Sequence, residues 1–324
     1  TTKRTCKSYQ WCCGRSYPLK KRVKMSGSCD GQVVIVTGAG RGLGRAHALA
    51  LASEGACVLV NDLGVSRDGE GKESSPADQV VHEILEMGGK AEANSADVAD
   101  WDQSEKMVSH AVEKWGRLDA LVCNAGFLRD RMLVGMSEED WDSVIRVHLK
   151  GHLAPARHAA IYWRNLAKEG KEPEGRIVMT SSGAGLMGSV GQGNYAAAKA
   201  GIALLVVQAA AEWEQYGVKV NGIAPDARTR MTEGVFYDSE IPEGWDEKDP
   251  KNVSPLVVWL SSKECTVTGK MFEISGGKIN LCDGWRHGPS EEVEGRKFEV
   301  NEISETVEKL IEKISPPESV YGSR

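Results

Sequence analysis

The glycine-rich stretch TGAGRGLG, residues 37–44, constrains the fold of this chain more than any other feature. It follows the short apolar run QVVIVT and precedes a helical pattern that ends at Gly55. Glycine permits a tight turn and a close approach of the backbone, and the start of a helix offers free N–H groups to a phosphate. The stretch fits the pattern T-G-x-x-x-G-x-G. It therefore predicts a strand–turn–helix unit that binds the pyrophosphate of a dinucleotide, with five candidate contacts: Gly38, Arg41, Gly42, Leu43 and Gly44.

Strand-like apolar runs alternate with helical patterns as far as residue 275. The runs are QVVIVT, CVLVND, AEANSAD, LDALVCNAG, RIVMTSS, VKVNGIAP and KMFEIS. This alternation predicts an α/β fold, a doubly wound seven-stranded parallel sheet of the Rossmann type, in a single domain over residues 26–285. Long helices are expected over residues 137–166, with a bend at Pro155, and over residues 194–216. Ligands of such sheets bind at the carboxyl ends of the strands.

Two segments lie outside that domain. Residues 1–25 contain eight Lys and Arg and no acid, without the apolar core of a signal peptide, which predicts a basic disordered leader. Residues 286–324 are expected to form a C-terminal extension with one amphipathic helix near residues 302–314.

Composition excludes several classes of function. The net charge is −6. Without the eight basic residues of the leader, the chain has 32 basic and 46 acidic residues, which is a net charge of −14. We therefore expect no nucleic-acid partner. Eight cysteines without C-x-x-C spacing indicate a reducing compartment and no metal site. The sequence contains no run of 18 or more apolar residues, so we expect no membrane span. We expect a cytoplasmic protein, with a peroxisome or mitochondrion as alternatives.

An acidic residue at the end of the second strand bears on the choice of cofactor. A carboxylate at Asp62 can accept hydrogen bonds from the adenosine ribose and repels a 2′-phosphate. Arg41 and Arg45 weigh slightly against this interpretation, because either could pair with an extra phosphate. We therefore predict NAD rather than NADP.

Polar residues also follow the third and fourth strands. Asp97 and Val98 could contact the adenine, or Asp97 could be an ordinary turn residue. Asn124 begins the turn Asn-Ala-Gly, where the middle of the cofactor should pass.

Three residues suggest proton chemistry. Tyr195 and Lys199 are four residues apart, so on a helix they share one face, and Ser182 follows the fifth strand. Such a Tyr–Lys pair often arises by chance, but beside a dinucleotide turn it indicates catalysis. A tyrosine has an ordinary pKa of about 10, which the Lys199 ammonium and a positive nicotinamide would lower, while Ser182 would hold the substrate oxygen. The glycine-rich residues between Ser182 and Tyr195 are expected to form a flexible wall.

Together these motifs resemble the short-chain dehydrogenase/reductase family over residues 28–285. The matching positions are Thr37, Gly38, Gly42, Gly44, Asp97, Asn124, Ala125, Gly126, Ser182, Tyr195, Lys199, Asn221 and Pro225. The resemblance implies that Ser182, Tyr195 and Lys199 are catalytic. It also implies that Tyr195, Lys199 and Pro225 contact the cofactor alongside the residues named above.

One branch of the family is more similar, the dehydrogenase domain of peroxisomal multifunctional enzyme type 2. The stretches that carry this likeness are VNDLG, FLRDRML, DWDSVIRVHLKG, GQGNYAAAKAG and IAPDARTRMTE. The likeness implies NAD-dependent oxidation of a (3R)-3-hydroxyacyl-CoA and a homodimer, with a homotetramer as the alternative. The chain departs from the family at His148, where many members have asparagine in a proton path from the lysine, and at Asp226, where glycine is usual.

Residues 226–250 are expected to cover the substrate. Their apolar side chains, among them Phe236, Tyr237, Ile241 and Trp245, would suit an acyl chain or a steroid, and Arg228 and Arg230 could meet a CoA phosphate. Three hypotheses follow. The first is a 3-hydroxyacyl-CoA dehydrogenase. The second is the same chemistry on a steroid, a sugar or an acyl-carrier-protein substrate. The third is a catalytically inactive nucleotide sensor on the same fold.

Overall fold

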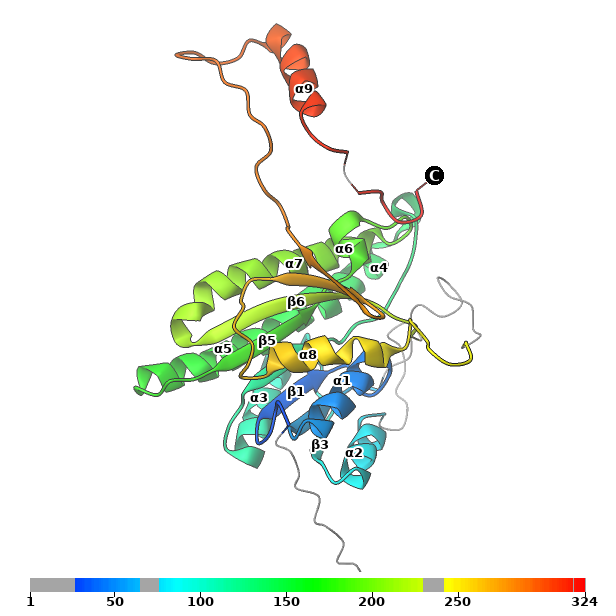
Figure 1. The fold of residues 1–324 in the computed structure, drawn as a ribbon, viewed down its shortest axis with the longest axis vertical. Coiled ribbons are helices and arrows are strands. Elements are labelled where there is room, and N and C mark those ends of the chain that lie inside the picture. Colours follow the sequence, from blue (N-terminus) through cyan, green and yellow to red (C-terminus); the bar gives the residue numbers. More distant parts are fainter. Residues whose placement is uncertain (1–26, 65–75, 230–241, 317, 324) are drawn as a thin grey trace, which may run out of the picture.

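The computed structural model describes residues 27–64, 76–229, 242–316 and 318–323. Its centre is one eight-stranded sheet with the strand order β3-β2-β1-β4-β5-β6-β7-β8 (Figure 1). The strands are β1 Val33–Thr37, β2 Cys57–Asn61, β3 Lys90–Asn94, β4 Ala120–Cys123, β5 Gly175–Thr180, β6 Val218–Asp226, β7 Met271–Ser275 and β8 Lys278–Cys282.

The seven predicted strands are parallel, and an eighth strand adds to them. β8 pairs antiparallel with β7 across a short turn at the edge of the sheet. The predicted Rossmann-type sheet is therefore confirmed, and β8, which the sequence does not predict, extends it by one strand. β1, β2, β4 and β5 are buried along their whole length because helices cover both faces of the sheet.

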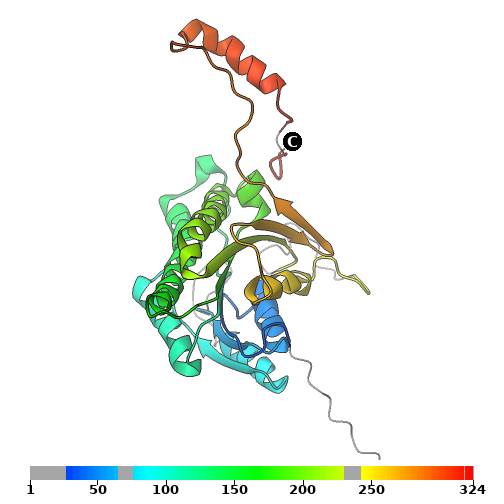
Figure 2. The same ribbon diagram turned by 60° about the vertical axis from the view of Figure 1, so that its left-hand side comes forward.

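The helices form one layer on each face of the sheet. α1 Gly42–Ser53, α2 Pro76–Glu86 and α8 Ser254–Ser261 pack their apolar side chains on one face. α3 Trp101–Trp115, α5 Gly151–Lys168 and α7 Gly193–Trp213 cover the other (Figure 2). Shorter elements are η1 Leu133–Gly135, α4 Glu138–Ile145, η3 Glu214–Tyr216 and η4 Pro250–Asn252.

The helix expected over residues 137–166 is interrupted at residues 146–150 and not at Pro155, where a bend was predicted. α4 and α5 are joined by a π-helical turn, η2 Arg146–Lys150, in which the Gly151 N–H bonds the Arg146 carbonyl five residues back. α5 then continues through Pro155 as one helix. The irregularity lies in the widened turn, which brings His148 to the interior.

The segment after Ser182 is more regular than expected. Residues 183–187 form the short helix α6 Gly183–Met187, with Ser182 as its N-cap, instead of an entirely flexible wall. Ser182 itself lies two residues beyond the end of β5.

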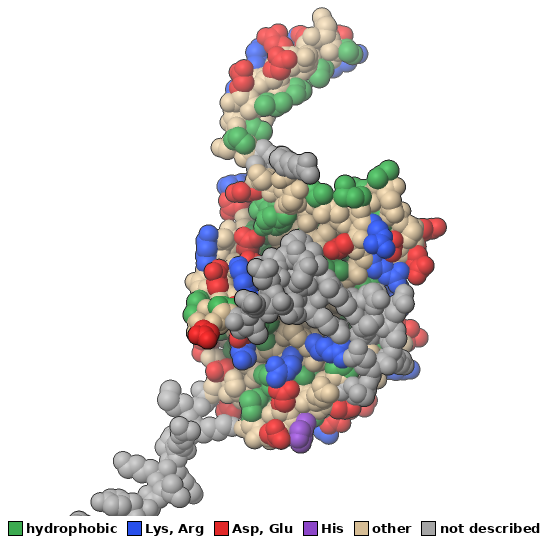
Figure 3. Space-filling view, turned by 90° about the vertical axis from the view of Figure 1, so that its right-hand side faces the viewer, with side chains coloured by type: hydrophobic (Ala, Val, Ile, Leu, Met, Phe, Trp, Pro, Cys, Tyr) green, Lys and Arg blue, Asp and Glu red, His purple; other side chains and the backbone are tan. Residues whose placement is uncertain are grey.

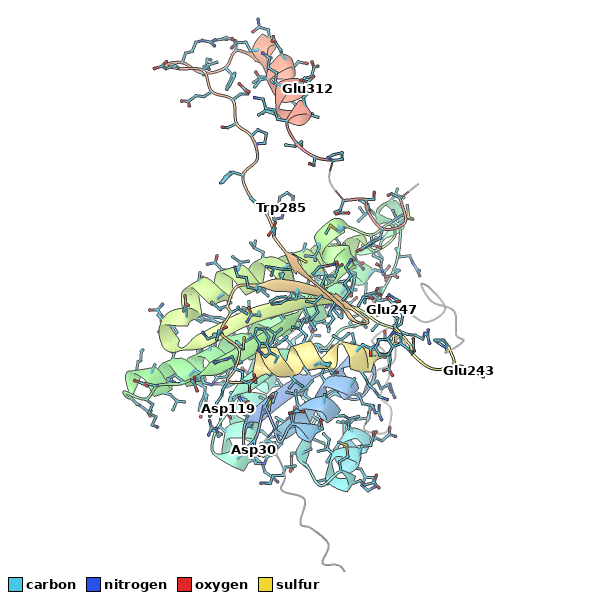
Figure 4. The ribbon with its side chains drawn as sticks, in the orientation of Figure 1. Asp30, Asp119, Glu243, Glu247, Trp285 and Glu312 are labelled. Carbon is cyan, nitrogen blue, oxygen red and sulfur yellow. The ribbon has the colours of Figure 1, made fainter. Side chains whose placement is uncertain are left out.

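Beyond β8 the chain leaves the body as an extended arm. Trp285 projects from its start (Figure 4), and η5 Val300–Glu302 leads into α9 Ile303–Glu312, where the amphipathic helix was predicted. No residue of α9 is buried. The chain then returns to the body, where Tyr321 pairs with Ser189. The predicted leader lies outside the described residues.

Candidate active site

The backbone of the glycine turn between β1 and α1 packs closely against its neighbours. Gly38 has a φ of +61°, and a Cβ placed there would lie 2.7 Å from the Ala125 Cα. A Cβ on Gly44 would overlap the Gly38 carbonyl oxygen. The first turn of α1 has no acidic side chain, so its N–H groups and the positive end of the helix dipole suit an anion. This cradle of backbone atoms fits the pyrophosphate of a dinucleotide.

Asp62 lies beside that turn, at the end of β2. One carboxylate oxygen accepts a hydrogen bond from the Gly40 N–H at 2.9 Å, and the other accepts one from the Gly64 N–H at 2.8 Å. A carboxylate oxygen has more than one lone pair, so both can still accept a bond from a ligand hydroxyl. The expected ribose contact is compatible with this position and remains a prediction.

Asp97 has local partners that the sequence did not reveal. One carboxylate oxygen accepts from the Ala99 N–H at 2.8 Å, and the other pairs with Arg146 of the π-turn at 2.6 Å. Val98 is buried and packs beside Gly151. These contacts give Asp97 the role of a turn residue that joins two loops, and an adenine contact is still only a prediction.

Asn124 joins the ends of β4 and β1. Its side-chain amide donates to the carbonyl oxygens of Thr37 at 3.1 Å and Gly38 at 3.2 Å. Its backbone N–H donates to the Thr37 hydroxyl at 2.9 Å. Asn124 therefore fixes the glycine turn from behind.

Ser182, Tyr195 and Lys199 lie together on α6 and α7. The Lys199 Nζ lies 5.4 Å from the centre of the Tyr195 ring and donates to the Thr180 carbonyl oxygen at 2.7 Å. The Ser182 hydroxyl accepts from the Ala184 N–H at 3.2 Å and hydrogen-bonds Tyr195. The shared helix face predicted for Tyr195 and Lys199 is thus present.

The protein alone does not make Tyr195 more acidic. Burial raises the pKa of Tyr195 to about 12, although the Ser182 hydrogen bond acts in the opposite direction. Burial also lowers the pKa of Lys199 to about 7, so its amine is only partly charged at neutral pH. The expected decrease of the tyrosine pKa therefore needs positive charge from outside the protein, as a bound oxidised nicotinamide would provide.

His148 packs directly against the phenol. Its ring meets the Tyr195 ring edge-on, with the centres 5.2 Å apart. Its Nε2 lies 2.7 Å from the Phe127 carbonyl oxygen and 3.1 Å from the Phe127 N, so the backbone of that residue holds the ring. A Cβ on Gly126 would overlap the His148 ring. Burial lowers the pKa of His148 to about 3, and the ring is neutral at physiological pH.

His152 was missed by the sequence reading, although it follows His148 by one helical turn. It is fully buried in α5, where burial and the nearby Lys199 hold its pKa well below the usual range. The i,i+4 spacing was the available signal.

The substrate side of the site is described in part. Pro225 lies in β6 opposite Ile274 of β7. The Arg228 guanidinium donates to Asp246 at 3.2 Å, and Trp245 is exposed. Part of the predicted substrate cover lies outside the described residues. This part includes Arg230, Phe236, Tyr237 and Ile241.

Two further properties concern metals and membranes. Among the described residues, no group of three His, Cys, Asp or Glu could hold a metal ion. Gly193–Tyr216, α7 with η3, is the one described helix that is long and apolar enough to cross a membrane, and 33% of the relevant window is buried. This helix contains Tyr195 and Lys199, and its Ile202 and Val206 pack in the core on one face of the sheet.

Comparisons with known proteins agree with this arrangement. The model of the short chain dehydrogenase family matches residues 32–239. A crystal structure of a short chain dehydrogenase from Mycobacterium avium superposes with a TM-score of 0.83 at 57% identity, covering 92% of this chain and all of that one.

Two curated relatives differ in how much of their length is matched. Hydroxyacyl-CoA dehydrogenase ChsB1 of Mycobacterium tuberculosis is 41% identical over 90% of this chain and 92% of its own length. Peroxisomal multifunctional enzyme type 2 of Mus musculus is 48% identical over 77% of this chain and only 32% of its own length. The chain thus spans about a third of the multifunctional enzyme. The cytoplasmic localisation expected for this chain stays a prediction.

Proposed function

Because the chain belongs to the short-chain dehydrogenase family, we propose that it is an NAD-dependent dehydrogenase that converts a (3R)-3-hydroxyacyl-CoA to the 3-oxoacyl-CoA. Oxidation or reduction between a secondary alcohol and a ketone is the chemistry common to such enzymes. The observation that supports the proposal is that the glycine turn follows β1, Ser182 follows β5, and the Lys199 amine bonds the Thr180 carbonyl oxygen at the end of β5.

The cofactor would bind along the ends of β1, β2 and β4. Gly38, Gly42, Gly44 and the first turn of α1, with Arg41 and Leu43, would hold its phosphates, and Asp62 its adenosine ribose. Tyr195, Lys199 and Pro225 would border its nicotinamide half. The nicotinamide, when bound, supplies a hydride acceptor.

Tyr195 acts as the acid/base group of this mechanism. Its phenolate oxygen takes the proton of the substrate hydroxyl during oxidation and returns a proton to the carbonyl oxygen during reduction. The Ser182 hydroxyl hydrogen-bonds the same substrate oxygen and orients it. Lys199 would hydrogen-bond the ribose next to the nicotinamide and, when protonated, would place positive charge near the phenolate.

Asp62 supports the choice of NAD. Its carboxylate lies at the end of β2, within hydrogen-bond distance of the glycine turn through the Gly40 N–H. A negative charge at this position repels a 2′-phosphate and accepts bonds from a 2′-hydroxyl.

The acyl-CoA part of the proposal is supported by the names of the relatives and by the surface of the site. ChsB1 is named a hydroxyacyl-CoA dehydrogenase. Figure 3 shows several Lys and Arg side chains on the side of the molecule where the loops after the strands gather. Such side chains suit a ligand that bears phosphate groups, as both NAD and CoA do.

A substrate panel tests this proposal. The purified chain is assayed for NAD reduction with a (3R)-3-hydroxyacyl-CoA, a 17β-hydroxysteroid and a simple secondary alcohol, each also with NADP. We expect turnover to be fastest with the acyl-CoA and NAD. A higher kcat/KM for the steroid would assign a hydroxysteroid dehydrogenase, and retained NAD binding without turnover of any substrate would assign the sensor.

A further inference from the structure

The chain returns to the candidate site after the long excursion through α9. The Val190 N–H donates to the Tyr321 carbonyl oxygen at 2.9 Å, and the Tyr321 N–H donates to the Gly188 carbonyl oxygen at 3.3 Å. These two bonds form a parallel bridge between Ser189 and Tyr321. A segment more than a hundred residues away in the sequence is thereby attached to the connection between Ser182 and Tyr195. We call residues 320–322 the strap.

Small residues in that connection accommodate the side chains of the strap. A Cβ on Gly183 would lie 2.8 Å from the Cε2 and hydroxyl oxygen of Tyr321, closer than real Cβ contacts. A Cβ on Gly188, whose φ is +85°, would lie 3.3 Å from a methyl group of Val320. The Tyr321 hydroxyl donates to the Glu273 carboxylate of β7 at 3.4 Å. The ring is thus held over Gly183 from the side of the sheet.

Gly183 directly follows Ser182 and opens α6. On the other side of this helix, a Cβ on Gly185 would lie 2.5 Å from the backbone carbonyl carbon of Lys199. α6 is therefore enclosed between the Tyr321 ring and the turn of α7 that carries Lys199. Because Ser182 caps α6 through the Ala184 N–H, a displacement of α6 displaces the Ser182 hydroxyl.

We propose that the strap fixes the wall of the substrate site and that Tyr321 is a positioning residue for Ser182. This proposal rests on the proposed function, because it gives Ser182 a role in holding the substrate oxygen. Removal of the ring allows α6 to move away from α7 and weakens the alignment of Ser182. Small misalignments of a group that contacts the reacting atoms are costly for catalysis.

The kinetic test compares variants of the full-length chain with a (3R)-3-hydroxyacyl-CoA and NAD. We expect Tyr321→Ala to lower kcat/KM roughly tenfold, mainly through kcat, with little change in the Kd of NAD, whose cradle lies on the β1 side of the sheet. Tyr321→Phe keeps the ring and should retain most of the activity. Trp285→Ala, which removes a fully exposed aromatic side chain from the same arm, is the matched control and should behave as the unmodified chain.

A double-mutant cycle makes the test specific. Gly183→Ala introduces a methyl group that collides with the Tyr321 ring, so it should lower kcat in the unmodified chain. In the Tyr321→Ala background the same methyl group meets no ring, and its effect should be at least about threefold smaller. Additive effects, or Tyr321→Ala kinetics within twofold of the unmodified chain, would overturn the proposal.

Amide hydrogen exchange provides a readout that does not depend on activity. The Val190 N–H, which bonds the strap, should exchange at least about tenfold faster in Tyr321→Ala than in the unmodified chain. Unchanged exchange there would also overturn the proposal. If instead Tyr195→Phe retained full turnover, the proposed function would fail, and the exchange result would still decide whether the strap holds the wall.

Discussion

At the scale of single residues, the phenol of Tyr195 begins with an unfavourable electrostatic environment for a base. Burial raises its pKa to about 12, and Lys199, with a pKa lowered to about 7, contributes only part of a charge at neutral pH. In the proposed mechanism, a positive charge that arrives with the cofactor would therefore have the larger effect on the phenolate. In the proposed mechanism, proton transfer would therefore depend on cofactor binding, and without the cofactor the phenol would stay protonated.

His148 should make the stability of the protein depend on pH. Its pKa is lowered to about 3 in the fold and has the ordinary value of 6.5 in the unfolded chain, so below pH 6.5 the unfolded chain binds a proton that the folded chain does not. The fold therefore loses stability as the pH falls, by about 2 kcal/mol at pH 5. Denaturant unfolding measures the free energy of unfolding at pH 7.5 and pH 5. The difference between these two values should be smaller in His148→Asn than in the unmodified chain by about that amount.

The control for this prediction is His287→Asn, which changes an exposed histidine on the C-terminal arm. It should leave the difference between the two pH values unchanged. If the free energy of unfolding changed equally between pH 7.5 and pH 5 in His148→Asn and in the unmodified chain, the His148 ring would not be held neutral in the fold.

Asp62 should determine the choice between NAD and NADP. Asp62→Asn keeps an oxygen that can accept the Gly40 N–H bond and removes the charge, whereas Asp62→Ala removes both. We expect both variants to lower the ratio of kcat/KM for NAD over NADP at least about tenfold, and only Asp62→Ala to weaken NAD binding as well. Steady-state kinetics with both cofactors measures this. An unchanged ratio in both variants would contradict the ribose contact.

At the scale of elements, the start of α1 and the end of β1 form one rigid unit. Gly44 approaches the Gly38 carbonyl oxygen so closely that no Cβ fits between them, and the Asn124 amide bonds that same oxygen at 3.2 Å. The helix can therefore present its first N–H groups to a ligand only if residue 44 is glycine.

Gly44→Ala should displace α1 from this turn. Because the obstacle is a backbone atom, the helix itself must move, and we expect NAD affinity to fall at least about tenfold. Calorimetric titration with NAD measures the affinity. Gly135→Ala, where an added Cβ meets no atom within 4 Å among the described residues, is the control. NAD binding of normal strength in Gly44→Ala would exclude this turn as the cofactor cradle.

Local patterns were enough to predict most elements, and long-range packing explains those that were missed. The apolar runs of β1, β2 and β5 could be recognised because both of their faces are buried. β8 could not, since four of its five residues are exposed and it has no alternating pattern of burial. The π-turn of residues 146–150 has no periodicity of its own. It is identified by the hydrogen bond from the Gly151 N–H to the Arg146 carbonyl, five residues back.

The candidate site was predictable to a similar extent. The glycine turn and the Tyr–Lys spacing identify a cradle and a helix face, because both depend on residues close in sequence. The pair of Asp97 with Arg146 and the contact of Tyr321 with Gly183 join residues that are dozens of positions apart. No local pattern carries such information, so these contacts emerged only from the folded chain.

At the scale of the whole molecule, apolar surface remains on the outside of α7 and along the arm. Leu204 and Val207 of α7 are 65% and 51% exposed. Val307 and Ile311 line one side of α9, where Figure 3 shows hydrophobic side chains in a row. Exposed apolar side chains grouped on a helix are typical of contacts between proteins. This distribution supports the expected homodimer or homotetramer.

Leu204→Glu should therefore weaken the expected homodimer or homotetramer. A buried charge at the centre of an apolar interface is costly, so the variant should shift toward a smaller species in size-exclusion chromatography with light scattering. Leu85→Glu, at a 52% exposed position of α2, is the control and should leave the mass unchanged. If Leu204→Glu kept the mass of the unmodified assembly, α7 would not form the interface.

The central claim is that Tyr195 transfers the proton of a secondary alcohol beside a bound NAD. The measurement that tests it most directly is turnover of a (3R)-3-hydroxyacyl-CoA by Tyr195→Phe, together with titration of NAD. The account predicts an NAD affinity within about twofold of the unmodified chain and a loss of at least about a hundredfold in kcat, as expected when an acid/base group is removed. Turnover close to that of the unmodified chain would contradict it.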